Sequence, residues 1–259
     1  MVNLKKYRVV FNYFVLLLTF LVLLSCGNNP FYLTKIEGKK IAITNTSSEL
    51  PAIENYIKPY RETIDKDLNT LLAFAPITFD KSGEWQSTIG NLLADITLER
   101  GNSIFLSRHQ RTIDICLLNS GGIRSIIPKG NVYTKTAFEV MPFENTSIVV
   151  DLKGAQIIEM VNYIITEKKP HPLAGLTFSI DKNSSANSIL VNGKPVINEQ
   201  IYAVITSDYL ANGGDKMDFF KKGIARYDLD YKLRNVLIDY LKDADTIPII
   251  TDIRIKKLN

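Results

Sequence analysis

Along most of the chain, segments with the apolar pattern of a β-strand alternate with segments that have the apolar period of an α-helix. Residues 201–210 (IYAVITSDYL) are an almost continuous apolar run, which is typical of a buried strand. In residues 88–97, Ile89, Leu92, Leu93 and Ile96 recur at i, i+3, i+4 and i+7, which predicts an amphipathic helix capped by Thr88. This succession of strand and helix patterns predicts an α/β or α+β domain rather than a bundle or a sandwich.

The same reasoning assigns the other segments. Asn192-Gly193 predicts a two-residue hairpin turn inside residues 188–196. A helix is predicted over residues 48–72, with Ser47 or Ser48 as its cap and Pro59 as a kink or break. The remaining predicted helices are 154–167 and 230–242, and the remaining predicted strands are 39–44, 114–118, 146–152, 176–180 and 247–255.

The N-terminus has the pattern of a targeting segment. Lys5, Lys6 and Arg8 precede an apolar run over residues 9–24, which is short for a membrane span of about 20 residues. The run ends in small residues before Cys26, a spacing that resembles a bacterial lipoprotein signal. We therefore expect a signal peptide (1–25), a lipid-attached tether (26–37) beginning with lipidated Cys26, and one domain (38–259) anchored to a bacterial membrane in the cell envelope, periplasmic or surface. An uncleaved anchor and an ordinary signal peptide are the alternatives.

The net charge argues against nucleic-acid binding, and the number of cysteines argues against a disulfide within the chain. Residues 1–25 carry three cations and no acids, so without them the net charge falls from +4 to +1. No basic stripe with interleaved aromatic residues is present, which argues against nucleic-acid binding. With Cys26 lipidated, Cys116 has no partner for a disulfide within the chain, and its apolar neighbours predict a core residue.

Two glycine pairs follow apolar strands: Gly121-Gly122 after LLNS, and Gly213-Gly214 after YLAN. Glycine permits a positive φ and a close backbone approach, so consecutive N–H groups can converge on an anion or on a ligand heteroatom. Glycine pairs also form ordinary tight turns, and each pair by itself leaves both interpretations open.

The neighbours of these pairs suggest a ligand. Arg124 could bond a phosphate or a ribose oxygen, and Asn119 offers a donor and an acceptor to a purine edge. Asp215 could accept from ribose hydroxyls. Phe143 and Tyr209 lie next to loop signals, where a base could stack on them for about 1–3 kcal/mol each; packing in the core is the alternative for both rings.

Five motifs occur in an order that resembles a known family. They are GNLLAD (90–95), LLNSGGIR (117–124), VMPFENT (140–146), DLKG (151–154) and DYLANGGDKMDFF (208–220). Together they resemble the C-terminal, substrate-binding domain of the 5′-nucleotidases and related bifunctional phosphoesterases, over about residues 38–258. The resemblance implies a single domain of that type, with a mixed sheet flanked by helices.

The resemblance also implies roles for matching residues. Asn119 and Arg124 would bind the nucleotide, Phe143 and Tyr209 would clamp the base, and Asp215 would bind ribose. The rest of the two loops (Gly121, Gly122, Asn212, Gly213 and Gly214) would complete the site. The family's arginine before its G-N-L motif would fall near Gly83, yet no arginine occurs from Phe79 to Asp95, and Lys81 is the substitute.

The chain lacks the residues of a two-metal phosphoesterase centre, which needs several histidines plus Asp and Asn ligands. It has two histidines, His109 and His171, both expected in solvated loops. No G-x-S-x-G, P-loop or CxxC motif is present. We therefore predict no metal, cofactor or catalytic residue in this chain and no hydrolysis by the chain alone.

Three hypotheses follow. The chain supplies the base clamp to a separate metallophosphoesterase chain that carries divalent metals, in nucleotide catabolism. Alternatively, it is a stand-alone nucleoside-binding lipoprotein. In the third hypothesis it is a degenerate scaffold with no catalytic role.

Overall fold

The computed structural model describes residues 4–24, 32–44 and 50–258, and its internal contacts divide the chain into two units, Met1–Pro51 and Ala52–Asn259. In the first unit, Leu4–Leu24 forms helix α1, and residues 32–44 have no regular secondary structure. Among the described residues, no helix is both long and apolar enough to cross a membrane. The predicted lipidation residue, Cys26, lies outside the described residues.

The second unit contains every described strand. Its helices are α2 (Pro51–Leu68), α3 (Thr88–His109), α4 (Thr134–Val140), α5 (Gly154–Glu167), α6 (Asp208–Ala211) and α7 (Leu233–Asp243), with 3-10 turns η1 (Ser120–Gly122), η2 (Gly214–Lys216) and η3 (Asp218–Lys222). Its strands are β1 (Leu71–Ala75), β2 (Ile115–Leu117), β3 (Gly130–Tyr133), β4 (Thr146–Lys153), β5 (Leu173–Ala174), β6 (Leu176–Ile180), β7 (Ala186–Val191), β8 (Lys194–Pro195), β9 (Ile201–Ser207), β10 (Ala225–Lys232) and β11 (Ile255–Lys257).

A mixed five-stranded sheet of order β10-β4-β9-β2-β5 forms the centre of this unit. Strand β9 pairs antiparallel with β4 and parallel with β2. It is buried from Tyr202 to Ser207 because it has a strand on each side and a packed layer on each face. This explains why its sequence is a continuous apolar run.

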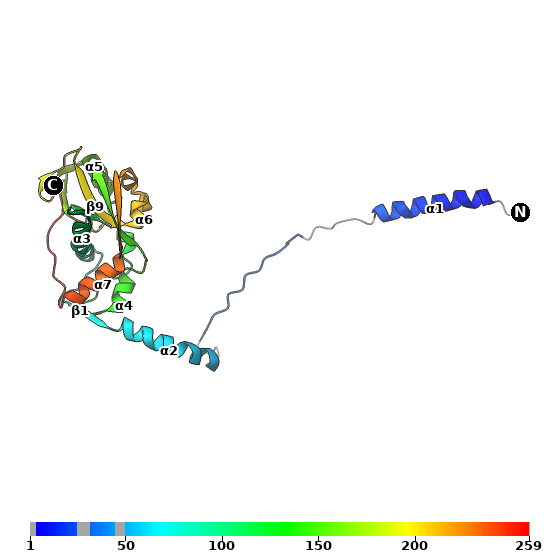
Figure 1. Cartoon of the computed structure of the whole chain (residues 1–259), viewed down its shortest axis with the longest axis horizontal. Coiled ribbons are helices and arrows are strands. Elements are labelled where there is room, and N and C mark those ends of the chain that lie inside the picture. The colour runs from blue at the N-terminus through cyan, green and yellow to red at the C-terminus, as the bar shows by residue number, and fades with distance from the viewer. Residues whose placement is uncertain (1–3, 25–31, 45–49, 259) are drawn as a thin grey trace. The chain divides into compact units, whose positions relative to one another are not determined.

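The two faces of the sheet pack against different helices. Cys116 and Ile205 belong to the core shared with α3, whereas Ile115 and Val204 belong to the core shared with α5. Successive residues of a strand alternate between faces, so one sheet serves both cores. A methyl group added at Gly101 would lie 2.2 Å from Ile205 Cδ1, which shows how closely α3 approaches the sheet. The predicted mixed sheet flanked by helices is therefore confirmed (Figure 1).

Two smaller sheets complete the unit: β1 pairs with β3, and β11-β6-β7-β8 form a four-stranded sheet. The hairpin predicted at Asn192-Gly193 is confirmed, since β7 and β8 pair antiparallel across it. Both turn residues have a positive φ, 49° at Asn192 and 77° at Gly193, as a tight two-residue turn requires. Cys116 is fully buried, and burial raises the pKa of its thiol, in keeping with a core residue.

Several predicted elements differ from the structure. The strand predicted at 39–44 is wrong: this segment is exposed and pairs with no described strand. The strand predicted at 247–255 is also wrong for most of its length, because only Ile255–Lys257 pairs, in parallel with β6. The last helix begins at Leu233 rather than Asp230, because the preceding residues are held in β10 by β4. Ser87, not Thr88, caps α3, and its side chain accepts from the N–H of Gly90 at 3.1 Å.

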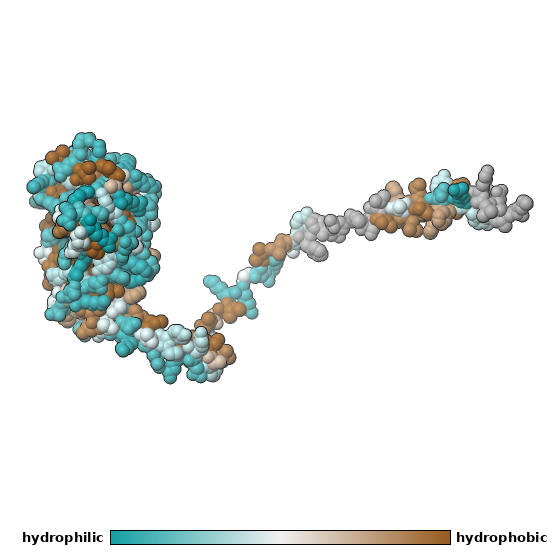
Figure 2. All heavy atoms as spheres, viewed as in Figure 1, coloured by the Kyte–Doolittle hydropathy of each residue, from teal (hydrophilic) through white to brown (hydrophobic). Residues whose placement is uncertain are grey.

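Helix α2 is shorter than predicted and carries no buried residue. It runs through Pro59 without a break and ends at Leu68, because Leu71–Ala75 pairs with β3. Its expected cap, Ser47 or Ser48, lies outside the described residues. Apolar residues remain on its surface (Figure 2). The second unit begins at Ala52, whereas the sequence predicts a domain that starts at residue 38.

Candidate functional site

The loop after β2 carries the first group of site residues. Strand β2 ends at Leu117, and η1 turns the chain sharply so that Asn119 and Arg124 both border the same hollow. The N–H groups of Gly122 and Ile123 donate within this turn, to the backbone oxygens of Asn119 and Ser120. These two N–H groups are therefore not free to converge on an anion.

The second group is the loop after α4, which presents Phe143. This ring is 49% exposed, and the guanidinium group of Arg124 lies over it at 6.0 Å from the ring centroid. The N-terminal residues of α7 hold the loop: the N–H of Leu233 donates to the backbone oxygen of Asn145 at 2.9 Å. Arg234, which is buried, donates to the backbone oxygen of Pro142 at 3.1 Å.

The third group lies where β9 ends. Tyr209 is on α6 and is 45% exposed, and its hydroxyl donates to Oδ1 of Asp215 at 2.8 Å. Nδ2 of Asn119 donates to Oδ2 of the same carboxylate at 2.6 Å. A methyl group added at Gly214 would lie 2.5 Å from the Tyr209 ring, so glycine is needed there for the ring to keep its position. Asp215 thus joins the two glycine loops, which are far apart in the sequence.

Seven of the ten predicted binding residues line one pocket of about 310 Å³, and Asn145 completes its lining. The seven are Asn119, Gly121, Gly122, Arg124, Phe143, Tyr209 and Asp215. The pocket combines two aromatic rings, a guanidinium group, a carboxylate and two amides. This combination can stack a flat ring and hydrogen-bond to polar groups at its edges.

The other three predicted residues do not line this pocket. Asn212 is the C-cap that follows α6, and its side chain accepts from Nη1 of Arg226 at 2.9 Å. Gly213 has a φ of +84°, a conformation that favours glycine, and it shapes the turn that brings Asp215 back toward Tyr209. Gly214 acts on the site through the space that it leaves for the Tyr209 ring.

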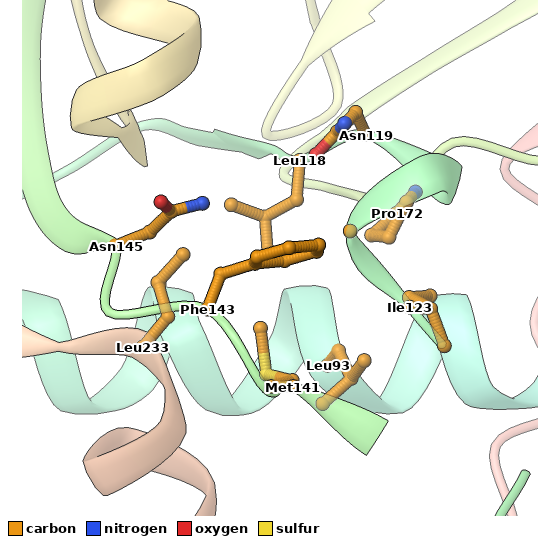
Figure 3. Close-up of a pocket in the computed structure, with 10 residues that line it drawn as sticks. Leu93, Leu118, Asn119, Ile123, Met141, Phe143, Asn145, Pro172 and Leu233 are labelled. Atoms are coloured by element: carbon orange, nitrogen blue, oxygen red, sulfur yellow. The ribbon is translucent and has the colours of Figure 1, made fainter. Parts of the chain in front are cut away.

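An apolar floor adjoins this pocket and was not predicted from the sequence. It is lined by Leu93, Leu118, Ile123, Met141, Pro172 and Leu233 together with Phe143 and the two amides. The amides of Asn119 and Asn145 lie on one side of the Phe143 ring, and Leu93 and Met141 lie on the other (Figure 3). Leu93 is one of the residues of the predicted helix pattern, but a pattern does not distinguish a core residue from the floor of a pocket.

The two histidines occupy different environments. His109 is exposed as predicted, but it is the last residue of α3 rather than part of a loop, and its ring centroid lies 4.6 Å from that of Tyr227. The prediction of a solvated loop is wrong for His171, which is 3% exposed because it is enclosed next to Ser120 and Tyr163. Burial lowers the pKa of His171 to about 4. In the described residues, no group of three or more His, Cys, Asp or Glu side chains could hold a metal ion.

The basic groups near the pocket come from several segments. Lys81 Nζ donates to the backbone oxygen of Ile123 at 2.8 Å, directly beside Arg124. Arg254 is buried, but it faces Asp95 at 2.7 Å and Asp252 at 2.8 Å and does not line the pocket. Lys81 thus contacts the loop that carries Arg124.

Comparisons with known proteins agree with one another. The family model of the 5′-nucleotidase C-terminal domain matches residues 68–222. An apyrase of Tabanus yao is 23% identical over 86% of this chain and 44% of its own length, and a 5′-nucleotidase of Vibrio vulnificus is 24% identical over 70% and 32%. The crystal structure of a 5′-nucleotidase precursor from Thermus thermophilus is similar, with a TM-score of 0.67 and 26% identity over 80% of this chain and 43% of that chain. The chain thus spans less than half the length of each of these relatives.

Proposed function

This chain belongs to the family of 5′-nucleotidase C-terminal domains, and from that membership we propose that it binds the nucleoside part of a nucleotide for a hydrolase system. In this proposal it supplies the base clamp to a separate metallophosphoesterase chain in nucleotide catabolism. Any divalent metals would be held by that partner, which would activate water and stabilise the phosphoryl transition state.

The observation that carries the proposal is the convergence of Asn119, Phe143, Tyr209 and Asp215 on one pocket. They come from three segments that are separate in the sequence, so their convergence is a property of the fold rather than of a local motif. The base would stack against Phe143 and Tyr209, whose exposed faces are available to a ligand. The Asp215 carboxylate would accept from ribose hydroxyls, and Asn119 would bond the base or the ribose.

Calorimetry with adenosine tests the clamp. We expect Phe143→Ala and Tyr209→Ala each to weaken adenosine binding by about tenfold or more, because each removes one stacking surface. Arg226→Gln is a suitable control, since Arg226 bonds Asn212 outside the pocket. Adenosine binding that survives both alanine substitutions unchanged would rule out the clamp.

Measurement of phosphate release tests whether a separate phosphoesterase chain needs this chain for hydrolysis. AMP is supplied to this chain alone, to a histidine-rich phosphoesterase from the same genome that lacks its own C-terminal domain, and to a mixture of the two. We expect release to rise on mixing and to require Phe143. If mixing the two chains does not increase phosphate release, the proposal of a separate catalytic chain fails. The proposal that this chain binds the nucleoside still stands.

A stand-alone nucleoside-binding protein is the second candidate. The observation that favours it is that two aromatic rings, two amides and a carboxylate of this chain already surround one pocket. Tight binding of adenosine without any gain in phosphate release on mixing would support this alternative.

We also propose that lipidated Cys26 anchors the protein to a membrane of the bacterial cell envelope. Replacement of this residue in Cys26→Ser would then release the protein from the membrane fraction and abolish incorporation of labelled fatty acid. A membrane-bound, unlabelled wild-type chain would instead indicate an uncleaved anchor.

A further inference from the structure

The Tyr209 hydroxyl makes two hydrogen bonds to a single residue, Asp215. It donates to Oδ1 of the carboxylate at 2.8 Å and accepts from the backbone N–H of the same residue at 3.2 Å. An aromatic ring stacks on a base through its face, without any need of a hydroxyl. The two bonds therefore indicate a role for the hydroxyl that is separate from the role of the ring.

The backbone of Asp215 has a conformation that residues with side chains rarely adopt. Its φ is 51° and that of Lys216 is 63°, so two consecutive residues lie in the left-handed region after Gly213. Such a backbone costs free energy, is retained only where neighbouring groups hold it, and is frequent at ligand sites. Here the N–H of Asp215 donates to Tyr209, and its backbone oxygen accepts from the Tyr163 hydroxyl at 2.8 Å. Two tyrosines thus hold this backbone.

The carboxylate of Asp215 is oriented as well, and it keeps acceptor sites for a ligand. Oδ1 accepts from the Tyr209 hydroxyl, and Oδ2 accepts from Nδ2 of Asn119 at 2.6 Å. A carboxylate has about four acceptor sites, so about one on each oxygen stays available. Two adjacent hydroxyl groups of a sugar can donate to these two sites together only if the carboxylate faces them. The two protein donors fix the direction in which it faces.

The ring of Tyr209 is placed by a different contact. A methyl group added at Gly214 would lie 2.5 Å from the ring, so the ring packs directly against the backbone of this glycine. The ring is 45% exposed and lines the pocket together with Phe143. Loss of the hydroxyl alone leaves this packing in place. An experiment can therefore separate stacking of the base from orientation of the carboxylate.

We propose that Tyr209 is a positioning residue for the sugar as well as a stacking residue for the base: its hydroxyl holds the Asp215 carboxylate in the direction that selects a ribose diol over a sugar without hydroxyls. This inference rests on the proposed function. One side chain thereby joins the two contacts, so a base that stacks on the ring finds the carboxylate already oriented for its ribose. Such pre-organisation raises affinity because the carboxylate loses little freedom on binding.

Calorimetry on the full-length chain in detergent compares adenosine with 2′,3′-dideoxyadenosine, which has the same base but no hydroxyl on C2′ or C3′. We expect the wild-type chain to bind adenosine about tenfold more tightly, because the dideoxy analogue cannot donate to the carboxylate. In Tyr209→Phe we expect this preference to fall to about threefold, with the affinity for 2′,3′-dideoxyadenosine unchanged. That unchanged affinity also shows that the variant is folded and that its ring still stacks.

Tyr231→Phe is the matched control. The Tyr231 hydroxyl also donates to an aspartate, to Oδ2 of Asp239 at 2.8 Å, and neither residue lines the pocket. This variant should keep the full preference for adenosine.

A double-mutant cycle tests whether Tyr209 acts through Asp215. Asp215→Asn removes the carboxylate and introduces a residue that tolerates a positive φ. We expect Asp215→Asn to lower the preference for adenosine, and Tyr209→Phe in that background to lower it no further, because the two side chains act as one unit. Losses that simply add would overturn the inference.

The outcomes separate this inference from the proposed function. If adenosine binds but Tyr209→Phe keeps the full preference, or weakens both ligands equally, the hydroxyl does not position the carboxylate, and the nucleoside pocket stands. The same conclusion follows if the wild-type chain binds the two ligands equally tightly. If the wild-type chain binds neither ligand, both proposals fail.

Discussion

Arg234 connects the start of α7 to the loop that carries Phe143. Its guanidinium group donates to the backbone oxygens of Met141 and Pro142 and pairs with Glu144, and it lies 4.2 Å from the centroid of the Phe138 ring. Hydrogen bonds from Lys232 and Arg234 to Glu144 lower the pKa of that carboxyl to about 2. A buried arginine thus holds the backbone just before the proposed stacking ring and the Glu144 side chain just after it.

Substitution of this arginine should loosen that loop. We expect Arg234→Met to lower the free energy of unfolding by about 2 kcal/mol, because it removes the donor to the carbonyl groups of Met141 and Pro142, and to weaken adenosine binding as well. Denaturant unfolding and calorimetry measure the two effects. Arg111→Met is the control: Arg111 bonds Asp151, near the other end of β4, so it should lose stability but not affinity. Unchanged adenosine affinity in Arg234→Met would contradict a positioning role.

The buried His171 predicts a dependence of stability on pH. The unfolded chain binds a proton near pH 6.5, whereas the folded ring stays neutral down to about pH 4. Between these values the unfolded state binds more protons, so the free energy of unfolding falls as the pH falls, by about 3 kcal/mol in total, and this contribution is constant below pH 4.

The asparagine variant isolates this contribution. His171→Asn can still accept from the N–H of Ser120 but does not titrate in this range, so its unfolding free energy should lose less between pH 6.5 and pH 4 than that of the wild type. Parallel pH profiles for the two proteins would show that His171 is not buried in the neutral form.

At the scale of elements, helices α5 and α2 have similar apolar periodicity but opposite environments. In α5, Ile157, Val161 and Ile164 are buried against the central sheet. In α2, Ile53, Tyr56 and Ile64 are more than half exposed. The apolar period predicted both helices, but it could not show that α2 carries no buried residue.

Substitution of one isoleucine in each helix measures how much each helix contributes to stability. We expect Ile164→Ala to lower the free energy of unfolding by about 3 kcal/mol, because it opens a cavity in the core beneath α5. Ile64→Ala should change it by less than about 0.5 kcal/mol, since the side chain is already in solvent. Thermal unfolding of the two variants tests this, and a large loss for Ile64→Ala would show that α2 is covered in solution.

Whether a strand could be predicted from the sequence depended on how deeply it is buried. Strand β9 was predicted because burial on both faces leaves a continuous apolar signal in its sequence. Strands β1, β3 and β10 were missed. Strand β10 lies at the edge of the central sheet, and apart from buried Leu229 its residues alternate between exposed and half-buried. Strands β1 and β3 form a sheet by pairing with each other. Their hydrogen bonds come from distant segments, which no local pattern records.

At the scale of the whole molecule, the division into two units predicts easy cleavage within residues 32–44. Residues 32–44 are exposed and without regular structure, and they include Lys35, Lys39 and Lys40. Brief trypsin digestion should cut there first and leave a stable fragment that contains residues 52–259, because the second unit is packed around two cores.

Mass spectrometry identifies the fragment, and calorimetry measures its affinity for adenosine. We expect that affinity to equal the affinity of the intact chain, since all pocket residues lie in the second unit. Early cleavage within α3 or α5, or loss of adenosine binding on cleavage after residue 40, would contradict this division.

The sequence by itself determined the family, the mixed α/β architecture and the glycine loops, because these depend on short motifs and on apolar periods that are local to each segment. Only the tertiary structure decided which of those residues share a pocket. It placed Asn119 and Asp215 in hydrogen-bond contact although they are 96 residues apart, turned Asn212 toward Arg226 and buried His171. Contacts of this kind depend on how distant strands pair and pack, and this is settled by the whole fold rather than by any one stretch of chain.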